Sequence, residues 1–230
     1  MSTLYTINVV NNSLSNQDFF FFQKPAIYTG GSQVYSNSLY QQMLLPSTSS
    51  GSTLTFQSLQ QFYAGAQTQV PKLTIGEASG YTTAIQPIDL TPVKANPSSP
   101  VNNATLMTVS PALGLSPAVP GPASEQSGAF RITTPTFNSL TQQYNAGMAV
   151  KNMVTGDIVL SNFVNAEPNK NIDCQPVMIF YVAVGSYEPG SVINFSESSV
   201  TSAVCDATTG FTSFDVVYNP DGTWTVVNLS

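Results

Sequence analysis

The sequence predicts an all-β protein, most simply an antiparallel β-sandwich. Apolar residues make up 42% of the 230 residues and charged residues only 8%. The chain can therefore bury a core, and it lacks the high charge that is typical of disordered segments. Short apolar or alternating segments, bounded by Gly, Pro, Asn and Ser, recur along the whole chain. Helical periodicity is confined to one short stretch, 38–45.

Strand signals begin at the N-terminus. Residues 5–10 alternate between polar and apolar side chains and end at the turn residues 11–13. Phe19–Phe22 are consecutive, so their side chains point to both faces of a strand, and we expect that strand to be covered on both sides. Further strands are predicted at 33–36, 53–63 and 81–85.

The second half of the chain carries the same signals. Its most apolar run, 176–185, should be a central strand. The sequence Asn219-Pro220-Asp221-Gly222 predicts a turn, because Pro presets φ and Gly accepts a positive φ. This turn would join 214–218 to 223–227 in a closing hairpin, and the first and last strands are candidates for the same sheet. The remaining predicted strands are 129–137, 146–151, 157–164, 191–195, 211–218 and 223–228.

Residues 91–128 differ from the rest, because they hold seven of the 16 prolines and no aromatic residue. They are either an irregular excursion within a single domain, 1–230, or a linker between 1–90 and 129–230. Within them, 106–109 could still pair as an edge strand. Residues 55–63 and 136–144 share six identities in nine positions. This echo indicates either two related β halves or a coincidence in a sequence of low diversity.

Charge excludes several partners. Residues 1–150 hold four basic and four acidic side chains, whereas 151–230 hold eight carboxylates and two lysines. Nucleic-acid binding needs a basic footprint, which is absent. No apolar run reaches the ~18 residues of a membrane span. The N-terminus lacks the features of a cleaved signal peptide, so we expect a cytoplasmic protein, one exported without a cleaved signal, or a mature form already trimmed.

The chain contains no histidine, which removes Ser-His and Cys-His nucleophiles and most zinc sites. We therefore expect no enzyme, no cofactor and no metal site; a calcium site would need a ligand loop that the sequence lacks. Cys174 and Cys205 are either free buried thiols or a bridge between neighbouring strands. One enzymatic route stays open, a glycosidase carboxylate pair, but no feature selects two among Asp157, Asp173, Glu188, Glu197, Asp206, Asp215 and Asp221.

Sugar binding by a β-sandwich would use an aromatic platform surrounded by amides and hydroxyls. The candidates for such a platform are Tyr187 and Trp224. A second aromatic group is Tyr28, Tyr35 and Tyr40, close to Gly30-Gly31. Each of these rings has core packing as its alternative role.

Two stretches carry a family resemblance. The first comprises 5–13, 20–31 and 34–40, and the second comprises 180–192. Together they resemble the rhizosphere-induced protein of rhizobia and its uncharacterised bacterial and fungal relatives. The resemblance implies an abundant product made under quorum-sensing control, with no established enzymatic activity and no catalytic residues to carry over.

The expected function is thus a non-enzymatic microbial interaction or structural protein. It would act by self-association as a homo-oligomer, or by contact with a host or microbial surface glycan. A lectin-like carbohydrate-binding module is the second expectation, and a carboxylate-pair glycosidase is the third.

Overall fold

The computed structural model describes residues 3–229 except 32, 51, 60, 95 and 123–125. Strands dominate it, as the all-β prediction requires. The strands are β1 Leu4–Asn11, β2 Gln17–Gln23, β3 Ile27–Thr29, β4 Val34–Asn37, β5 Tyr40–Leu44, β6 Leu54–Leu59, β7 Phe62–Gln69, β8 Gly80–Ile88, β9 Ala104–Thr108, β10 Gly114–Leu115, β11 Phe130–Thr133, β12 Tyr144–Lys151, β13 Ile158–Asn165, β14 Asn171–Gln175, β15 Ile179–Val184, β16 Val192–Ile193, β17 Ala203–Asp206, β18 Ser213–Tyr218 and β19 Trp224–Leu229. The helical segments are short: α1 Ser47–Ser50, α2 Phe195–Val200 and the 3-10 turn Ala207–Thr209.

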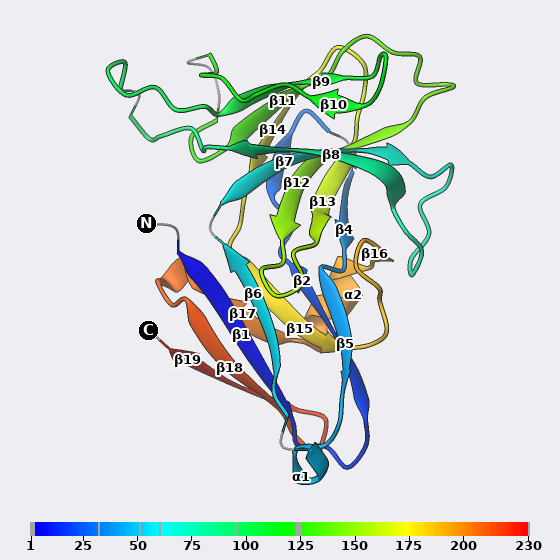
Figure 1. Cartoon of the computed structure of the whole chain (residues 1–230), viewed down its shortest axis with the longest axis vertical. Coiled ribbons are helices and arrows are strands. Elements are labelled where there is room, and N and C mark those ends of the chain that lie inside the picture. Colours follow the sequence, from blue (N-terminus) through cyan, green and yellow to red (C-terminus); the bar gives the residue numbers. More distant parts are fainter. Residues whose placement is uncertain are drawn as a thin grey trace.

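The strands form four sheets that pack in two layered pairs (Figure 1). In the lower half of the view, the terminal sheet (β19-β18-β1-β6) faces the phenylalanine sheet (β17-β15-β2-β5). In the upper half, the six-stranded sheet (β16-β4-β13-β12-β7-β8) faces the five-stranded sheet (β10-β9-β11-β14-β3). Most pairs are antiparallel, while β1 with β18 and β9 with β11 are parallel. The first and last strands share the terminal sheet, as predicted.

Every sheet mixes strands from before residue 90 with strands from after residue 129. The pairs β1–β18, β2–β15, β3–β14 and β7–β12 each join these two parts of the chain. Residues 91–128, between them, contribute β9 and β10 to the five-stranded sheet. The predicted strand at 106–109 is therefore present as β9, but it lies inside the sheet, and β10 forms the edge.

The four consecutive phenylalanines lie on a strand that is covered on both faces, as expected. Phe19 and Phe21 belong to the large core cluster between the terminal and phenylalanine sheets, and Phe21 stacks on Phe56 with ring centroids 5.1 Å apart. Phe20 and Phe22 point the other way, where Phe22 stacks on Tyr181 at 5.0 Å. The run 176–185 contains β15, which is a central strand of this sheet.

Several predicted elements are wrong. The segment 38–45 is not a helix: it contains β5, because pairing with β2 and burial of Leu39 and Leu44 override its helical composition. The single strand predicted at 53–63 is two strands, β6 and β7, in different sheets. Only 130–133 of the segment 129–137 is a strand. Only 192–193 of 191–195 is a strand, because Asn194 caps α2 by accepting from the N–H of Glu197.

The two similar segments, 55–63 and 136–144, adopt different structures. Residues 55–59 lie in β6, whereas 136–143 are irregular and precede β12. The Ala-Gly steps that follow the two copies do meet, because Gly65 in β7 pairs with Gly147 in β12. A Cβ on Gly147 would lie 2.3 Å from the carbonyl oxygen of Asn162, so this close approach requires glycine.

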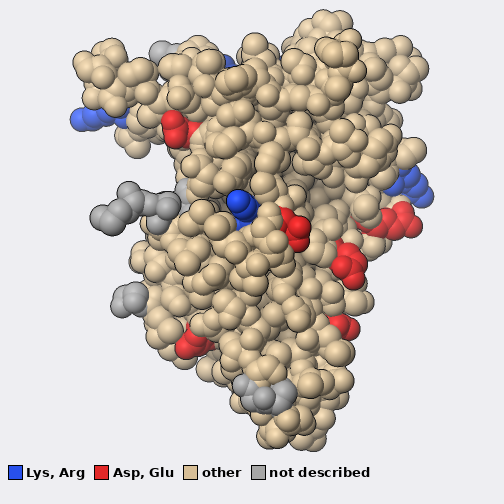
Figure 2. Space-filling model, in the orientation of Figure 1, with Lys and Arg blue, Asp and Glu red and all other residues tan. Residues whose placement is uncertain are grey.

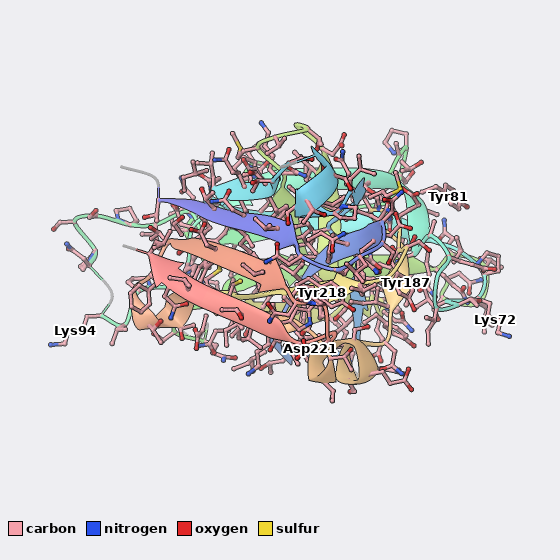
Figure 3. All side chains as sticks on the ribbon, turned by 90° about the horizontal axis from the view of Figure 1, so that it is seen from below. Lys72, Tyr81, Lys94, Tyr187, Tyr218 and Asp221 are labelled. Atoms are coloured by element: carbon pink, nitrogen blue, oxygen red, sulfur yellow. The ribbon has the colours of Figure 1, made fainter. Side chains whose placement is uncertain are left out.

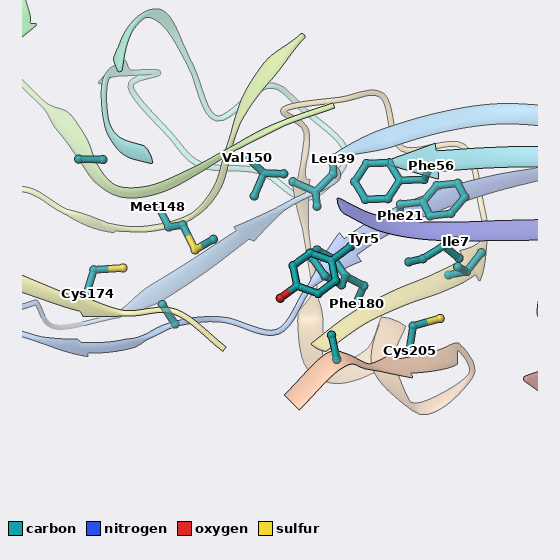
Figure 4. Close-up of a cluster of buried hydrophobic side chains, with 14 of the residues drawn as sticks. Tyr5, Ile7, Phe21, Leu39, Phe56, Met148, Val150, Cys174, Phe180 and Cys205 are labelled. Carbon is teal, nitrogen blue, oxygen red and sulfur yellow. The ribbon is translucent and has the colours of Figure 1, made fainter. Parts of the chain in front are cut away.

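The two cysteines are free and buried, in different sheets. Figure 4 shows Tyr5 and Phe180 between them, so they form no bridge. Burial raises the pKa of each thiol to about 12, which keeps both thiols protonated at neutral pH and unreactive as nucleophiles.

Candidate functional site

The last hairpin of the chain presents an open sheet edge. Its turn is the predicted Asn219-Pro220-Asp221-Gly222, with Gly222 at φ +83°. The Asp221 carboxylate accepts from the N–H of Thr223 at 3.1 Å and from its hydroxyl at 2.7 Å. These bonds lower the pKa of Asp221, the side-chain bond to Thr223 being the larger cause. Tyr218 and Asp221 lie at this end of the hairpin (Figure 3), and β19 runs from it as the outermost strand of the terminal sheet (Figure 1).

The hydrogen bonds of the turn fix which backbone groups of β19 face outward. The N–H of Asn219 donates to the carbonyl of Thr223 at 2.8 Å, so 219 and 223 form a hydrogen-bonded pair. Such pairs alternate along an antiparallel ladder. The strand register of β18 and β19 then assigns Thr225, Val227 and Leu229 to bonds with β18. The N–H and C=O groups of the alternate residues, Trp224, Val226 and Asn228, point away from β18.

A second observation supports this assignment. The carbonyl of Thr212 accepts from the N–H of Thr6 in β1, and the carbonyl of Tyr218 accepts from the N–H of Asn12, the residue after β1. Even-numbered residues of β18 therefore face β1 and odd-numbered ones face β19. The outward groups of Trp224, Val226 and Asn228 have no hydrogen-bond partner among the residues that the structure describes. These three residues, with their free backbone groups, are called the β19 edge below.

Little charge lies near the β19 edge. The strand reads Trp-Thr-Val-Val-Asn-Leu, without charge or proline, and Val227 and Leu229 are 49% and 37% exposed. Few charged side chains lie on the face shown in Figure 2. Lys72 and Lys94 project from opposite sides of the molecule (Figure 3), so they form no basic patch. An uncharged open edge favours pairing with another strand.

The outer face of the terminal sheet is polar and ordered by its own side chains. Asn8 donates to Asp215 at 3.0 Å and accepts from the hydroxyl of Thr55 at 3.0 Å. One step along the same face, Gln57 donates to Thr6 at 3.3 Å. This ladder spans three neighbouring strands, so amides, hydroxyls and one carboxylate cover part of the face, beside the exposed side chains of Val227 and Leu229.

The two rings expected as sugar platforms are packed and lie apart. The indole N–H of Trp224 donates to the carbonyl of Thr201 at 2.8 Å, and its ring contacts Phe19 at 5.9 Å. Tyr187 lies 4.8 Å from Phe20. Phe19 and Phe20 project from opposite faces of β2, so Trp224 and Tyr187 lie on opposite faces of the phenylalanine sheet.

The tyrosines near Gly30-Gly31 do not form one group either. Tyr28 is held by the carbonyl of Asn162, to which its hydroxyl donates at 2.7 Å, and burial raises its pKa well above the usual value. Tyr40 packs against Phe21 at 5.8 Å. Tyr35 alone lines a surface pocket, together with Ser36 and Phe195.

Several carboxylates proposed for a catalytic pair have structural partners. Asp173 forms a bidentate ion pair with Arg131, at 2.7 and 2.9 Å. Asp206 caps the 3-10 turn, Asp221 closes the hairpin turn, and Asp215 bonds to Asn8. Within the described residues, no group of three or more Asp, Glu or Cys side chains could hold a metal ion.

Comparison with known proteins gives one match. A search of curated proteins and a search of solved structures each find no significant similarity. Over the residues described, no helix combines the length and the apolar character that crossing a membrane requires. The family model named RhiA matches residues 2–229, which is nearly the whole chain, and so the chain belongs to the RhiA family of rhizosphere-induced proteins.

Proposed function

We propose that this RhiA-family chain is a non-enzymatic interaction protein that associates with a second copy of itself through the β19 edge. The row of outward N–H and C=O groups at Trp224, Val226 and Asn228 carries the proposal, because such a row, bonded only to water in the monomer, is a template for an added strand. Closed two-fold symmetry is the commonest arrangement of homo-oligomers. A two-fold axis at Val226 would bring each β19 antiparallel to its copy.

The register of this contact follows from the alternation. Val226 would pair with Val226 of the second copy, and Trp224 would pair with Asn228 in both directions. Each such pair exchanges two hydrogen bonds, which gives about six across the contact. The terminal sheets of the two copies would then be continuous, and their polar outer faces would form one surface for contact with a host or microbial cell.

The strength of such a contact should be modest. It consists of one strand from each copy, so it is small compared with stable interfaces, and we expect a dissociation constant on the order of micromolar. A protein made abundantly under quorum-sensing control would pass through this range as its concentration rises. Self-association would then follow cell density.

The structural roles of the carboxylates support a role without catalysis. Asp173, Asp206, Asp215 and Asp221 each accept a hydrogen bond that holds local structure. The thiols, with pKa values of about 12, are poor nucleophiles at neutral pH.

Sedimentation equilibrium tests the proposal. The monomer mass is 24.5 kDa, and we expect the average mass to rise toward twice that value over about 1–200 µM protein, the range around a micromolar dissociation constant. Each copy carries a formal net charge of −6 at pH 7, so two copies repel each other. Salt should therefore strengthen the contact by screening repulsion. A strict monomer over the whole range would refute the proposal, and so would an oligomer that salt dissociates.

A further inference from the structure

We propose that a surface pocket at the start of β8 binds a neutral pyranose unit of a glycan chain. The pocket lies between β8, the end of β7 and the turn before β12, in the half of the molecule away from the β19 edge (Figure 1). Its cavity volume is about 400 Å³, within the range of small-ligand sites. This inference goes beyond the proposed self-association and does not depend on it.

A β-bulge at Thr82 determines which face of the sheet carries Tyr81. Gln67 of β7 pairs with Thr83 of β8. The next residue of β7, Thr68, pairs with Tyr81, so Thr82 is an extra residue between the two pairs. Regular alternation from Thr83 would place Tyr81 on the opposite face of β8. The bulge thus redirects the tyrosine, as bulges beside functional sites often do.

The bulge is strained, and the strain does not serve the core. Thr82 has φ +51°, which is unfavourable for a β-branched residue. Such strain is found most often at functional sites, where the surrounding structure enforces it. Tyr81 is 61% exposed, and Figure 3 shows it at the periphery of the molecule, so its burial does not offset the strain. Protection of the edge strand β8 accounts for a bulge, but not for an exposed tyrosine beside it.

Tyr81 completes a row of side chains across three strands. Thr68 pairs with Tyr81 on one side and with Tyr144 of β12 on the other, so the three side chains share one face of the six-stranded sheet. Tyr144 is buried against Phe137, with ring centroids 5.2 Å apart, and closes the inner end of the row. The backbone of Tyr81 lies two strand spacings from that of Tyr144, about 10 Å. The row therefore leaves room for one sugar ring over Thr68.

The turn before β12 forms another wall of the pocket and is held by hydrogen bonds. The side chain of Asn138 accepts from the N–H of Leu140 at 3.1 Å, and its carbonyl accepts from the N–H of Gln142 at 2.8 Å. The carbonyl of Gln143 accepts from the N–H of Gln69 at 2.9 Å, which ties the turn to β7. The pocket is therefore preformed, so that a ligand pays little ordering entropy on binding.

The chemistry of the lining matches a neutral sugar. No lining residue is charged, and all except Pro71 and Leu140 carry a phenol ring, a hydroxyl or an amide. The hydroxyl of Tyr81 and the side-chain amide of Gln142 form no hydrogen bond with a described residue, so both are available to sugar hydroxyls. The exposed Tyr81 ring offers an apolar surface to the C–H face of a pyranose.

The openness of the pocket favours a unit within a chain over a small free ligand. A small-ligand site normally encloses most of its ligand, whereas Tyr81 at the rim is 61% exposed and Leu140 is 91% exposed. A glycan chain can place one unit on the Tyr81 ring while its neighbouring units remain in solvent.

Ligand-observed saturation-transfer NMR tests the site. The probes are neutral tetrasaccharides, the β-linked tetramers of glucose, mannose and galactose. At about 5 mM, suited to millimolar affinity, we expect transfer to at least one of them. Because no lining residue is charged, this signal should change less than about twofold between about 0.05 and about 0.5 M NaCl. Val226→Pro, which weakens the proposed β19 contact, should leave it unchanged, so the two proposals fail separately.

Substitutions assign the signal to the pocket. Tyr81→Ala should abolish transfer, whereas Tyr81→Phe keeps the ring and should retain most of it. Neither should change the melting temperature much, because the side chain is exposed. Gln142→Ala should weaken binding about fivefold, the worth of one hydrogen bond. Gln86→Ala, which removes an amide from the same strand β8 but outside the pocket, is the matched control and should leave binding unchanged.

Three results would overturn the inference. The first is no transfer to any of the neutral tetrasaccharides. The second is binding that Tyr81→Ala leaves unchanged, which would place the sugar elsewhere on the molecule. The third is binding that is lost in about 0.5 M NaCl, which would show an ionic contact that this pocket does not contain.

Discussion

Proline at position 226 should separate the two copies without disturbing the monomer. Val226 directs its N–H away from β18, so proline there removes no hydrogen bond within the sheet. In the proposed dimer each copy loses one donor, so two of about six bonds are lost at about 1 kcal/mol each. The sum of about 2 kcal/mol predicts a dissociation constant about 30-fold higher. Sedimentation equilibrium of Val226→Pro beside the parent measures this shift.

Val227→Pro is the matched control, one residue along the same strand. Val227 pairs with Asp215, and its N–H donates to β18. Proline at this position has no N–H, so a carbonyl of β18 inside the sheet loses its hydrogen bond, and the free energy of unfolding should fall by about 2 kcal/mol. Urea unfolding at about 0.1 µM, where a micromolar dimer is mostly dissociated, should show this loss for Val227→Pro and little change for Val226→Pro. Equal losses for both variants would refute the assignment of outward groups. A dimer unaffected by Val226→Pro would refute the contact itself.

Three further predictions concern the fold. Both cysteines should resist a thiol reagent in the native state, and the free energy of unfolding should fall above pH ~9. The pKa of each thiol is about 12 in the folded protein, above its value in the unfolded chain. The stabilisation from the buried neutral thiols is therefore complete below the unfolded pKa and is lost as the pH rises toward 12. Urea unfolding at pH ~8 and ~10 should differ by about 1 kcal/mol per thiol, and by less in Cys205→Ala; no difference would contradict their burial. Asp173→Asn should cost about 2 kcal/mol in urea unfolding, because it removes a carboxylate that accepts two hydrogen bonds from the Arg131 guanidinium; an unchanged stability would mean that the ion pair contributes nothing. Gly222→Ala should cost about 1 kcal/mol in thermal unfolding, because its φ of +83° is unfavourable for alanine; a higher melting temperature would show that the turn adopts another conformation.

Patterns that are local in the sequence predicted the fold well. The alternation in 5–10, the apolar run 176–185 and the turn at 219–222 each depend on neighbouring residues, and all three are confirmed. The composition also predicted the all-β class. The family was predicted from two short stretches, and the family match over residues 2–229 confirms it.

Features that depend on distant residues could not be predicted. β5 has a helical composition and becomes a strand only because β2 lies beside it. The parallel pairing of β1 with β18 joins residues about 207 positions apart, and no local pattern specifies it. The β19 edge was missed for the same reason, because which backbone groups of Val226 face outward depends on the register with β18. The sequence feature that could have indicated the β19 edge is the uncharged run after the last turn.

The other sheet edges show why the β19 edge is informative. Proteins protect edges with prolines, short strands or cross-links to other segments. Here β8 carries Pro87, which has no N–H to offer, and the carbonyl of Gln57 in β6 is occupied by the N–H of Met153. At β5, the side chain of Asn11 donates to the carbonyl of Leu44 at 3.0 Å. The edge strands β3, β10, β16 and β17 are short, with three, two, two and four residues. β19 is six residues long and has neither charge nor proline. The other edges are shorter or blocked, so β19 of a second copy is the strand of this protein best able to pair along the whole β19 edge.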